Sequence, residues 1–129
     1  METSTPNKQN WTHWFEIPVS DMKRAQKFYE TVFDTKIDVM QFGPNFEMGI
    51  FPHLETGCAL VFNPEFYVPS QDGVLVYMNA LPDLQPTLDR IVTAGGNVIQ
   101  TKTQISPEHG FMAIFLDSEG NRLALHSME

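Results

Sequence analysis

The stretch Met48-Gly-Ile-Phe-Pro-His-Leu-Glu55 aligns without a gap with Met112-Ala-Ile-Phe-Leu-Asp-Ser-Glu119, which lies 64 residues further along the chain. Four of the eight aligned positions are identical. A second apolar segment follows each stretch, Cys58-Ala-Leu-Val-Phe62 in the first half and Arg122-Leu-Ala-Leu-His126 in the second. The repeat predicts one small domain built from two copies of a unit, with its chemistry in the space that the copies enclose.

The residues before the first repeated stretch predict a strand and a helix. Residues 12–19 alternate, so that Trp14 and Glu16 fall on one face of a strand and Phe15 and Ile17 on the other. A helix ending near residue 34 follows, because apolar side chains then recur every three or four residues. This predicted stripe consists of Ala25, Phe28, Tyr29, Val32 and Phe33.

The second copy repeats this order. Residues 74–78 predict a strand, and Pro82-Asp83 begins a helix that Gly95-Gly96 ends. The expected apolar stripe of this helix is Leu84, Leu88, Ile91 and Val92. Three strand-like stretches follow each helix, at 36–42, 46–51 and 58–62 and at 97–104, 111–116 and 122–127.

The unit is therefore β-α-β-β-β, and it occurs twice in an α+β fold. The expected domain covers residues 11–129, with units at about 11–62 and 73–127 joined by a linker at 63–72. The offset between the copies grows from 60 to 64, so four extra residues are expected within 101–110 of the second copy.

Composition limits the classes of partner. The net charge of −8 and a pI near 4.8 oppose nucleic acid, since phosphate binding needs a basic surface. No apolar run is long enough to span a membrane, and residues 1–10 lack the apolar region of a signal peptide. Together with the single cysteine, Cys58, this predicts a cytoplasmic protein with a disordered lead-in at 1–10.

Two motifs connect these units to a known family. The first is Val19-Ser-Asp-Met-Lys-Arg-Ala-Gln-Lys-Phe-Tyr-Glu-Thr-Val-Phe33, and the second is Asp117-Ser-Glu-Gly-Asn-Arg-Leu-Ala-Leu-His126. With paired βαβββ units, they resemble the vicinal oxygen chelate superfamily, which includes glyoxalase I, bleomycin-resistance proteins and extradiol dioxygenases. The resemblance implies curled mixed sheets that enclose a cup-shaped cavity, and a homodimer.

The resemblance also implies four positions at which metal-dependent members offer ligands to one divalent ion. In this chain those positions hold Trp14, Leu60, Val74 and Ala124. An indole or an alkyl side chain supplies no oxygen, imidazole or thiolate donor. We therefore expect no metal at the usual site and no other cofactor.

Strand alternation predicts the side chains that line the cup. Glu16 and His126 are the candidate catalytic residues. The candidate ligand-binding residues are Trp14, Cys58, Leu60, Phe62, Val74, Val76, Met78, Arg122 and Ala124. Such an apolar lining with few polar groups is typical of a site for a small molecule.

Each polar candidate has two interpretations. Glu16 could act as a general base if the cup desolvates its carboxyl group, or it could pair with Arg122 or face the wet mouth of the cup. His126 could share a proton with Glu16 or be a hydrogen-bonded histidine at the edge of a sheet. Cys58 could be a nucleophile, but a buried, inert thiol fits its strand position better.

Three functions follow from these residues. The first is a protein that binds a small, partly apolar molecule in a cup without the usual metal ligands. The second is a metal-independent lyase or isomerase with Glu16 as base. The third is a glyoxalase- or dioxygenase-type metal enzyme with relocated ligands, such as Glu16 and His126.

Overall fold

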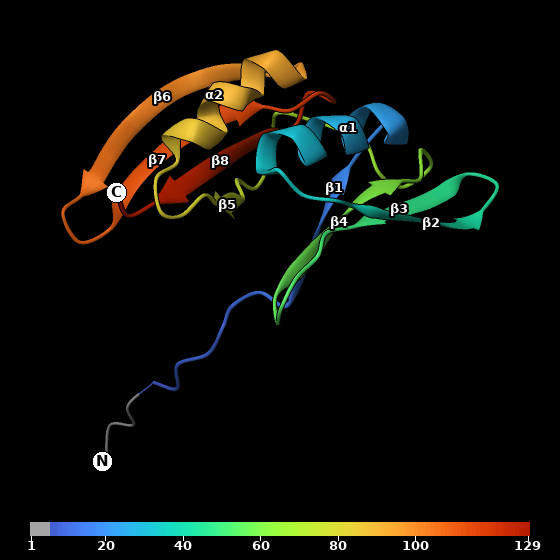
Figure 1. Cartoon of the computed structure of the whole chain (residues 1–129). Helices are drawn as coiled ribbons and strands as arrows, with labels where there is room; N and C mark the ends of the chain where they lie inside the picture. Colours follow the sequence, from blue (N-terminus) through green and yellow to red (C-terminus); the bar gives the residue numbers. More distant parts are fainter. Residues whose placement is uncertain (1–5) are drawn as a thin grey trace, which may run out of the picture.

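The computed structural model describes residues 6–129. Of the predicted lead-in, residues 1–5 lie outside the described part, and residues 6–10 form an exposed segment without regular structure. Figure 1 shows this segment leading away from the body of the molecule before the first strand begins.

The first unit contains one helix and four strands. They are β1 (Trp14–Pro18), α1 (Met22–Phe33), β2 (Asp38–Gly43), β3 (Phe46–Ile50) and β4 (Gly57–Phe62). The side chain of Asp21 caps α1 by accepting a 3.1 Å hydrogen bond from the amide of Arg24. The helix ends at Asp34, which adopts the left-handed conformation with φ 50°.

The second unit has the same order of elements. They are β5 (Tyr77–Asn79), α2 (Gln85–Ala94), β6 (Asn97–Ser106), β7 (Gly110–Leu116) and β8 (Arg122–Ser127). Proline lies in the first turn of α2, where its missing amide costs no hydrogen bond, and Gly95 ends the helix with φ 107°.

Sheet topology confirms the predicted repeat. The strand order is β1-β4-β3-β2 in one four-stranded sheet and β5-β8-β7-β6 in the other. In each sheet the first strand runs parallel to the last strand of its unit, and the remaining pairs are antiparallel. The α+β class with two βαβββ units is thus confirmed, although the two sheets do not close into a barrel.

Three predicted details of the second unit differ from the structure. β5 begins at Tyr77 rather than at Val74, whose side chain is 90% exposed. Val92 was expected to face the core and is 64% exposed. The four extra residues do not lengthen a loop. Strand β6 extends to Ser106 and contains them, and its pairing with β7 shifts register at several points.

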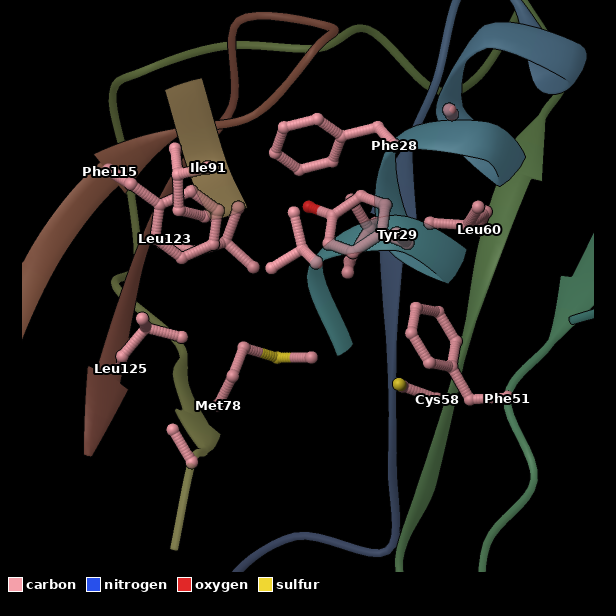
Figure 2. Close-up of a cluster of buried hydrophobic side chains, with 14 of the residues drawn as sticks. Phe28, Tyr29, Phe51, Cys58, Leu60, Met78, Ile91, Phe115, Leu123 and Leu125 are labelled. Atoms are coloured by element: carbon pink, nitrogen blue, oxygen red, sulfur yellow. The ribbon is translucent and has the colours of Figure 1, made fainter. Parts of the chain in front are cut away.

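The hydrophobic core lies where both helices meet the two sheets (Figures 1 and 2). Phe28 and Tyr29 of α1 pack edge to face, with ring centroids 5.0 Å apart. Phe28 also stacks with Phe115 of β7 at 6.4 Å, and Tyr29 contacts Phe51 at 5.6 Å. A single helix therefore joins the cores of both units.

No helix within residues 6–129 combines the length and the apolar character needed to cross a membrane.

Candidate functional site

The pairing of β1 with β4 decides which side chains of the first sheet share a face. Glu16 pairs with Ala59, whereas Ile17 pairs with Leu60. Directly paired residues point to the same side of a sheet. Ile17 and Leu60 belong to the core beneath α1, so Glu16 lies on the opposite, outer face.

The prediction that one face of the first unit carries all its candidate residues is therefore wrong. Trp14 and Glu16 lie on the outer face. The members of the set on the helix-covered face are Cys58, Leu60 and Phe62. Leu60 is fully buried in the core, where no ligand can reach it.

The second sheet divides its candidates in the same way. Tyr77 pairs with Ala124 and Asn79 with His126, so Ala124 and His126 lie on the outer face. Met78 pairs with Leu125 and belongs to the core on the helix-covered side. The expected single cup face is thus split in both units.

A cavity with a volume of about 740 Å³ lies between the two units. We call it the inter-unit cavity. The first unit lines it from β1, β4, the end of α1 and the β3–β4 connection, including Phe15, Phe33, Thr35, Phe51, His53 and Cys58. The second unit lines it from β5 and the segment before it, including Val74, Val76, Tyr77 and Met78.

Figure 2 shows the walls at the lower end of the core. Met78 extends from β5 toward Phe51 and Cys58 of the first unit. Four predicted ligand-binding residues line this cavity, namely Cys58, Val74, Val76 and Met78. Cys58 and Met78 belong to the core on the helix-covered side, whereas Val74 lies before β5 and is 90% exposed.

The inter-unit cavity is electrically neutral. Its lining within residues 6–129 includes no Asp, Glu, Lys or Arg. Burial raises the pKa of the Cys58 thiol to about 12, which keeps it protonated at neutral pH. Cys58 therefore acts as a small apolar wall group and not as a nucleophile.

His53 is the titratable group at the rim of this cavity. Its Nδ1 lies 2.8 Å from the carbonyl oxygen of Phe51. Its ring rests over Gly57 and meets Trp14 edge to face at 5.4 Å between centroids. His53 was not among the candidate site residues predicted from the sequence. In the aligned repeats it lies opposite Asp117, where the two copies differ.

Glu16 belongs to a separate cluster on the outer face. The hydroxyl of Tyr67 donates a 2.5 Å hydrogen bond to its Oε1, and Nε1 of Trp14 donates to its Oε2 at 3.3 Å. The hydrogen bond to Glu16 raises the pKa of Tyr67. The sequence offered no signal for Tyr67, since it lies in the irregular linker.

The expected pairing of Glu16 with Arg122 is not found. Nη2 of Arg122 donates to the carbonyl oxygen of Gly73 at 3.2 Å, and its Nε has no partner within the described residues. Glu16 and Arg122 both border a smaller cavity of about 140 Å³ between the units.

His126 does not reach Glu16 either. Its Nε2 lies 2.7 Å from the carbonyl oxygen of His109, to which it donates, and it belongs to the second sheet. No hydrogen bond joins Glu16 and His126 in the part of the chain that the structure describes. The two candidate catalytic residues therefore form no pair within one chain.

The two sequence motifs bind each other across the units. Tyr29 donates a 2.6 Å hydrogen bond to Oδ2 of Asp117, and Asn121 donates to the carbonyl oxygen of Pro18 at 2.7 Å. Glu119 accepts from the amides of Ser20 and Asp21, both at 2.9 Å. Arg24 adds an ion pair to Glu119 at 2.7 Å. These contacts hold the units together above the cavity.

A family model provides the assignment that these motifs and the topology suggest. The model of the Glyoxalase/Bleomycin resistance protein/Dioxygenase superfamily matches residues 11–125. The chain belongs to this superfamily. A glyoxylase-like domain-containing protein from Didymella fabae is 29% identical over 117 residues, covering 85% of this chain and 88% of that protein.

Solved structures of the superfamily share the fold. A glyoxalase/bleomycin resistance protein from Albidiferax ferrireducens T118 superposes with a TM-score of 0.74 at 10% identity, covering 93% of this chain and all of the other. Glyoxalase I from Zea mays gives a TM-score of 0.69 at 17% identity, over 89% of this chain. The match covers 45% of the maize protein.

The strand register shows which side chains lie on the outer face near the four positions to which the resemblance assigns metal ligands. Register places Ala59 beside Glu16, so Ala59 replaces Leu60 as the outer-face residue of β4. Tyr77 replaces Val74 in the same way, paired with Ala124. Trp14, Ala59 and Ala124 carry no donor atom for a metal, whereas Tyr77 and Glu16 on the outer faces carry oxygen donors. Among residues 6–129 no three His, Cys, Asp or Glu side chains gather closely enough to hold a metal.

Proposed function

We propose that this protein binds a small, partly apolar molecule in the inter-unit cavity and does so without a metal. The observation that carries the proposal is the cavity itself, about 740 Å³ in volume and lined by aromatic, aliphatic and sulfur-containing side chains from both repeats. Sites for small molecules commonly have this size and this predominantly apolar lining.

The chemistry of the lining favours binding over catalysis. A general acid or base must lie within hydrogen-bonding reach of the reacting atom, and a nucleophile needs a lowered pKa or an adjacent base. Cys58 has a raised pKa, and the described lining carries no carboxylate or ammonium group. Its imidazole, His53, contacts the carbonyl oxygen of Phe51 and has no carboxylate or nucleophile as a hydrogen-bond partner among residues 6–129. Sequestration of a ligand needs none of these groups.

A neutral fluorescent probe, N-phenyl-1-naphthylamine, tests the proposal. Its fluorescence should rise with saturation on the wild-type protein and fall back in Val76→Trp, which fills the cavity. Val92→Trp, on the exposed face of α2, is the matched control and should bind as the wild type does.

Thr35→Trp and its control Thr93→Trp provide a second pair, because Val76 packs against the core and its replacement could impair folding. Both Thr variants replace a helix-end or loop residue outside the core. Probe binding that persists in folded Val76→Trp and Thr35→Trp would place the ligand elsewhere and overturn the proposal.

A separate experiment tests the proposal that the protein functions without a bound metal. The donor sets at the outer-face positions offer too few ligands for Zn, Ni, Fe or Mn. Elemental analysis after loading with each ion and dialysis should find less than stoichiometric metal. A stoichiometric metal would favour the alternative of a metal enzyme with relocated ligands.

A second candidate function rests on the outer face of the first sheet. The 2.5 Å hydrogen bond between Tyr67 and Glu16 places a proton donor directly on a carboxylate. Such a pair suits metal-independent proton transfer of the lyase or isomerase kind, with Glu16 as base. His126 would take part only if a second copy of the chain brought its second sheet to this face.

Exchange of carbon-bound protons of hydroxyacetone in D₂O, followed by NMR in the presence of EDTA, tests this candidate. Glu16→Gln should abolish any catalysed exchange, and Glu55→Gln, in an exposed turn, should not. Exchange that is equal in both variants would remove Glu16 from the mechanism.

We further propose that the protein is a homodimer in the cytoplasm. The outer faces of both sheets are covered by no helix and carry exposed apolar side chains, among them Met40 and Tyr77. Apolar sheet faces of this kind commonly mark contacts between protein chains. The single free cysteine suits a reducing compartment.

A further inference from the structure

The neutrality of the inter-unit cavity limits what it can bind. The chain carries a net charge of −8, yet none of the described residues that line the cavity is an Asp, Glu, Lys or Arg. A charged ligand would lose its hydration without gaining a counter-ion, which is unfavourable in an apolar site. The cavity therefore selects an uncharged molecule.

The walls suit a flat ring. Phe15 and Phe51 line one side, and the thioether of Met78 reaches across from β5 (Figure 2). Sulfur contacts to aromatic rings are favourable, and an unbranched methionine adapts to the shape of what it covers. Aromatic side chains favour offset or edge-to-face contacts with a bound ring.

One polar group at the rim is oriented by the protein and is free to meet a ligand. A carbonyl oxygen can only accept, so Nδ1 of His53 carries the proton in its 2.8 Å contact with Phe51. In the tautomer with the proton on Nδ1, Nε2 is an acceptor, and no hydrogen bond to it is found within residues 6–129. Gly57 beneath the ring and Trp14 at its edge hold the imidazole in this orientation.

We propose that the occupant of the inter-unit cavity is an uncharged aromatic molecule with a hydroxyl group, and that this hydroxyl donates a hydrogen bond to Nε2 of His53. The proposal rests on the binding function proposed above and names the chemical class of its ligand. His53 is then the residue that determines specificity, while the aromatic and methionine walls provide affinity.

Three naphthalene probes test the proposal by isothermal titration on the full chain at pH 7. They are 2-naphthol, 2-methoxynaphthalene, which lacks the donor, and 2-naphthoate, which is charged. A single hydrogen bond of ordinary strength should make 2-naphthol bind about three- to tenfold more tightly than 2-methoxynaphthalene. The 2-naphthoate anion should bind at least about tenfold more weakly than 2-methoxynaphthalene.

His53→Phe should remove the preference for 2-naphthol, so that the ratio of its affinity to that of 2-methoxynaphthalene falls to about one. His13→Phe is the matched control, since His13 is exposed and does not line the cavity, and it should keep the preference. His53→Leu provides a second variant without a ring, so that the conclusion does not depend on the folding of one protein.

The possible outcomes distinguish a failure of the proposed role of His53 from a failure of the proposed binding function. If none of the probes binds, the binding function fails and this inference fails with it. If 2-methoxynaphthalene binds as well as 2-naphthol does, or if both His53 variants keep the preference, the role of His53 is overturned while the binding function stands. Tightest binding of 2-naphthoate would overturn the selection of uncharged ligands.

Discussion

Glu119 joins the two units through several polar contacts. Its side chain is fully enclosed and accepts hydrogen bonds from Ser20 and Asp21 at the start of α1, besides its ion pair with Arg24. Three residues of the first motif thus meet one carboxylate of the second motif. The chemistry of the family signature in this chain is therefore structural, because it joins the units around the inter-unit cavity.

Replacing this carboxylate should destabilise the whole fold. Glu119→Gln leaves several donors without an ionised acceptor, and each unsatisfied donor costs about 1–3 kcal/mol when buried. Arg24 is half exposed and can turn to water, so we expect a total loss of about 2–4 kcal/mol in the free energy of unfolding. Urea unfolding measures it, with Glu55→Gln as the exposed control. A loss below about 0.5 kcal/mol, the range of surface substitutions, would contradict the proposed role.

The same carboxylate should make stability depend on pH in the acid range. Its burial acts to raise the pKa, but hydrogen bonds from Arg24 and Ser20 outweigh burial and lower the pKa from 4.5 to about 2. The folded state therefore binds the proton less readily than the unfolded state does. The stabilisation is fully present above pH 4.5 and is lost as the pH falls toward about 2.

Urea midpoints recorded between pH 5 and pH 2 should show this loss in the wild type and a shallower slope in Glu119→Gln. Asp117 acts in the opposite sense, because burial raises its pKa despite the hydrogen bonds from Tyr29 and Asn121. Its contribution is present in strong acid and is lost as the pH rises through its pKa, and it is common to both proteins. Equal slopes in the two proteins would show that Glu119 is not the group that titrates.

At the scale of elements, the junction between β4 and the preceding connection positions His53. A Cβ on Gly57 would lie 2.6 Å from Cδ2 of His53, closer than side-chain carbons approach. Gly57→Ala should therefore displace the imidazole, lower stability by about 1–3 kcal/mol as overpacking does, and remove the preference for 2-naphthol.

Gly43→Ala is the matched control, because a Cβ there meets its nearest neighbour at an ordinary 3.9 Å. Both glycines lie at the ends of strands in the same sheet and have no left-handed backbone. The imidazole chemical shifts and the three probe affinities measure the effect. Unchanged His53 shifts in Gly57→Ala would contradict the proposed packing.

The elements also show where the sequence suffices and where it does not. β1 alternates, so the sequence correctly separates Trp14 and Glu16 from Phe15 and Ile17. β4 is buried along nearly its whole length and is apolar at successive positions. Because polar and apolar residues do not alternate in it, its sequence does not show which residues lie on which face. This is why Cys58 and Leu60 were assigned to the wrong face.

Contacts in the site between residues far apart in the sequence could not be predicted from the sequence. Nothing local in the chain predicts that Tyr67 of the linker meets Glu16, since that contact joins residues far apart in sequence. The orientation of the His53 ring likewise depends on its contacts with Gly57 and Phe51, which the sequence does not show. The repeat and the motifs therefore predict the fold, whereas the site requires the register of the strands.

At the scale of the whole molecule, the outer sheet faces carry exposed apolar side chains that no helix covers. On the first sheet Trp14 and Met40 are 37% and 40% exposed, and on the second sheet Tyr77 is 50% exposed. The helices lie on the other side of both sheets (Figure 1). A second copy that covers these faces would bury apolar surface and could bring Glu16 of one chain toward His126 of the other.

We expect sedimentation equilibrium to give a dimer for the wild type and a monomer for Met40→Glu, since a charge within an apolar interface has no partner. Val92→Glu, on the exposed face of α2, should remain dimeric. Loss of dimerisation should leave the affinity of N-phenyl-1-naphthylamine for Met40→Glu unchanged, because Met40 does not line the inter-unit cavity. A wild type that sediments as a monomer at tens of micromolar would refute the dimer, and with it any catalytic pairing of Glu16 with His126.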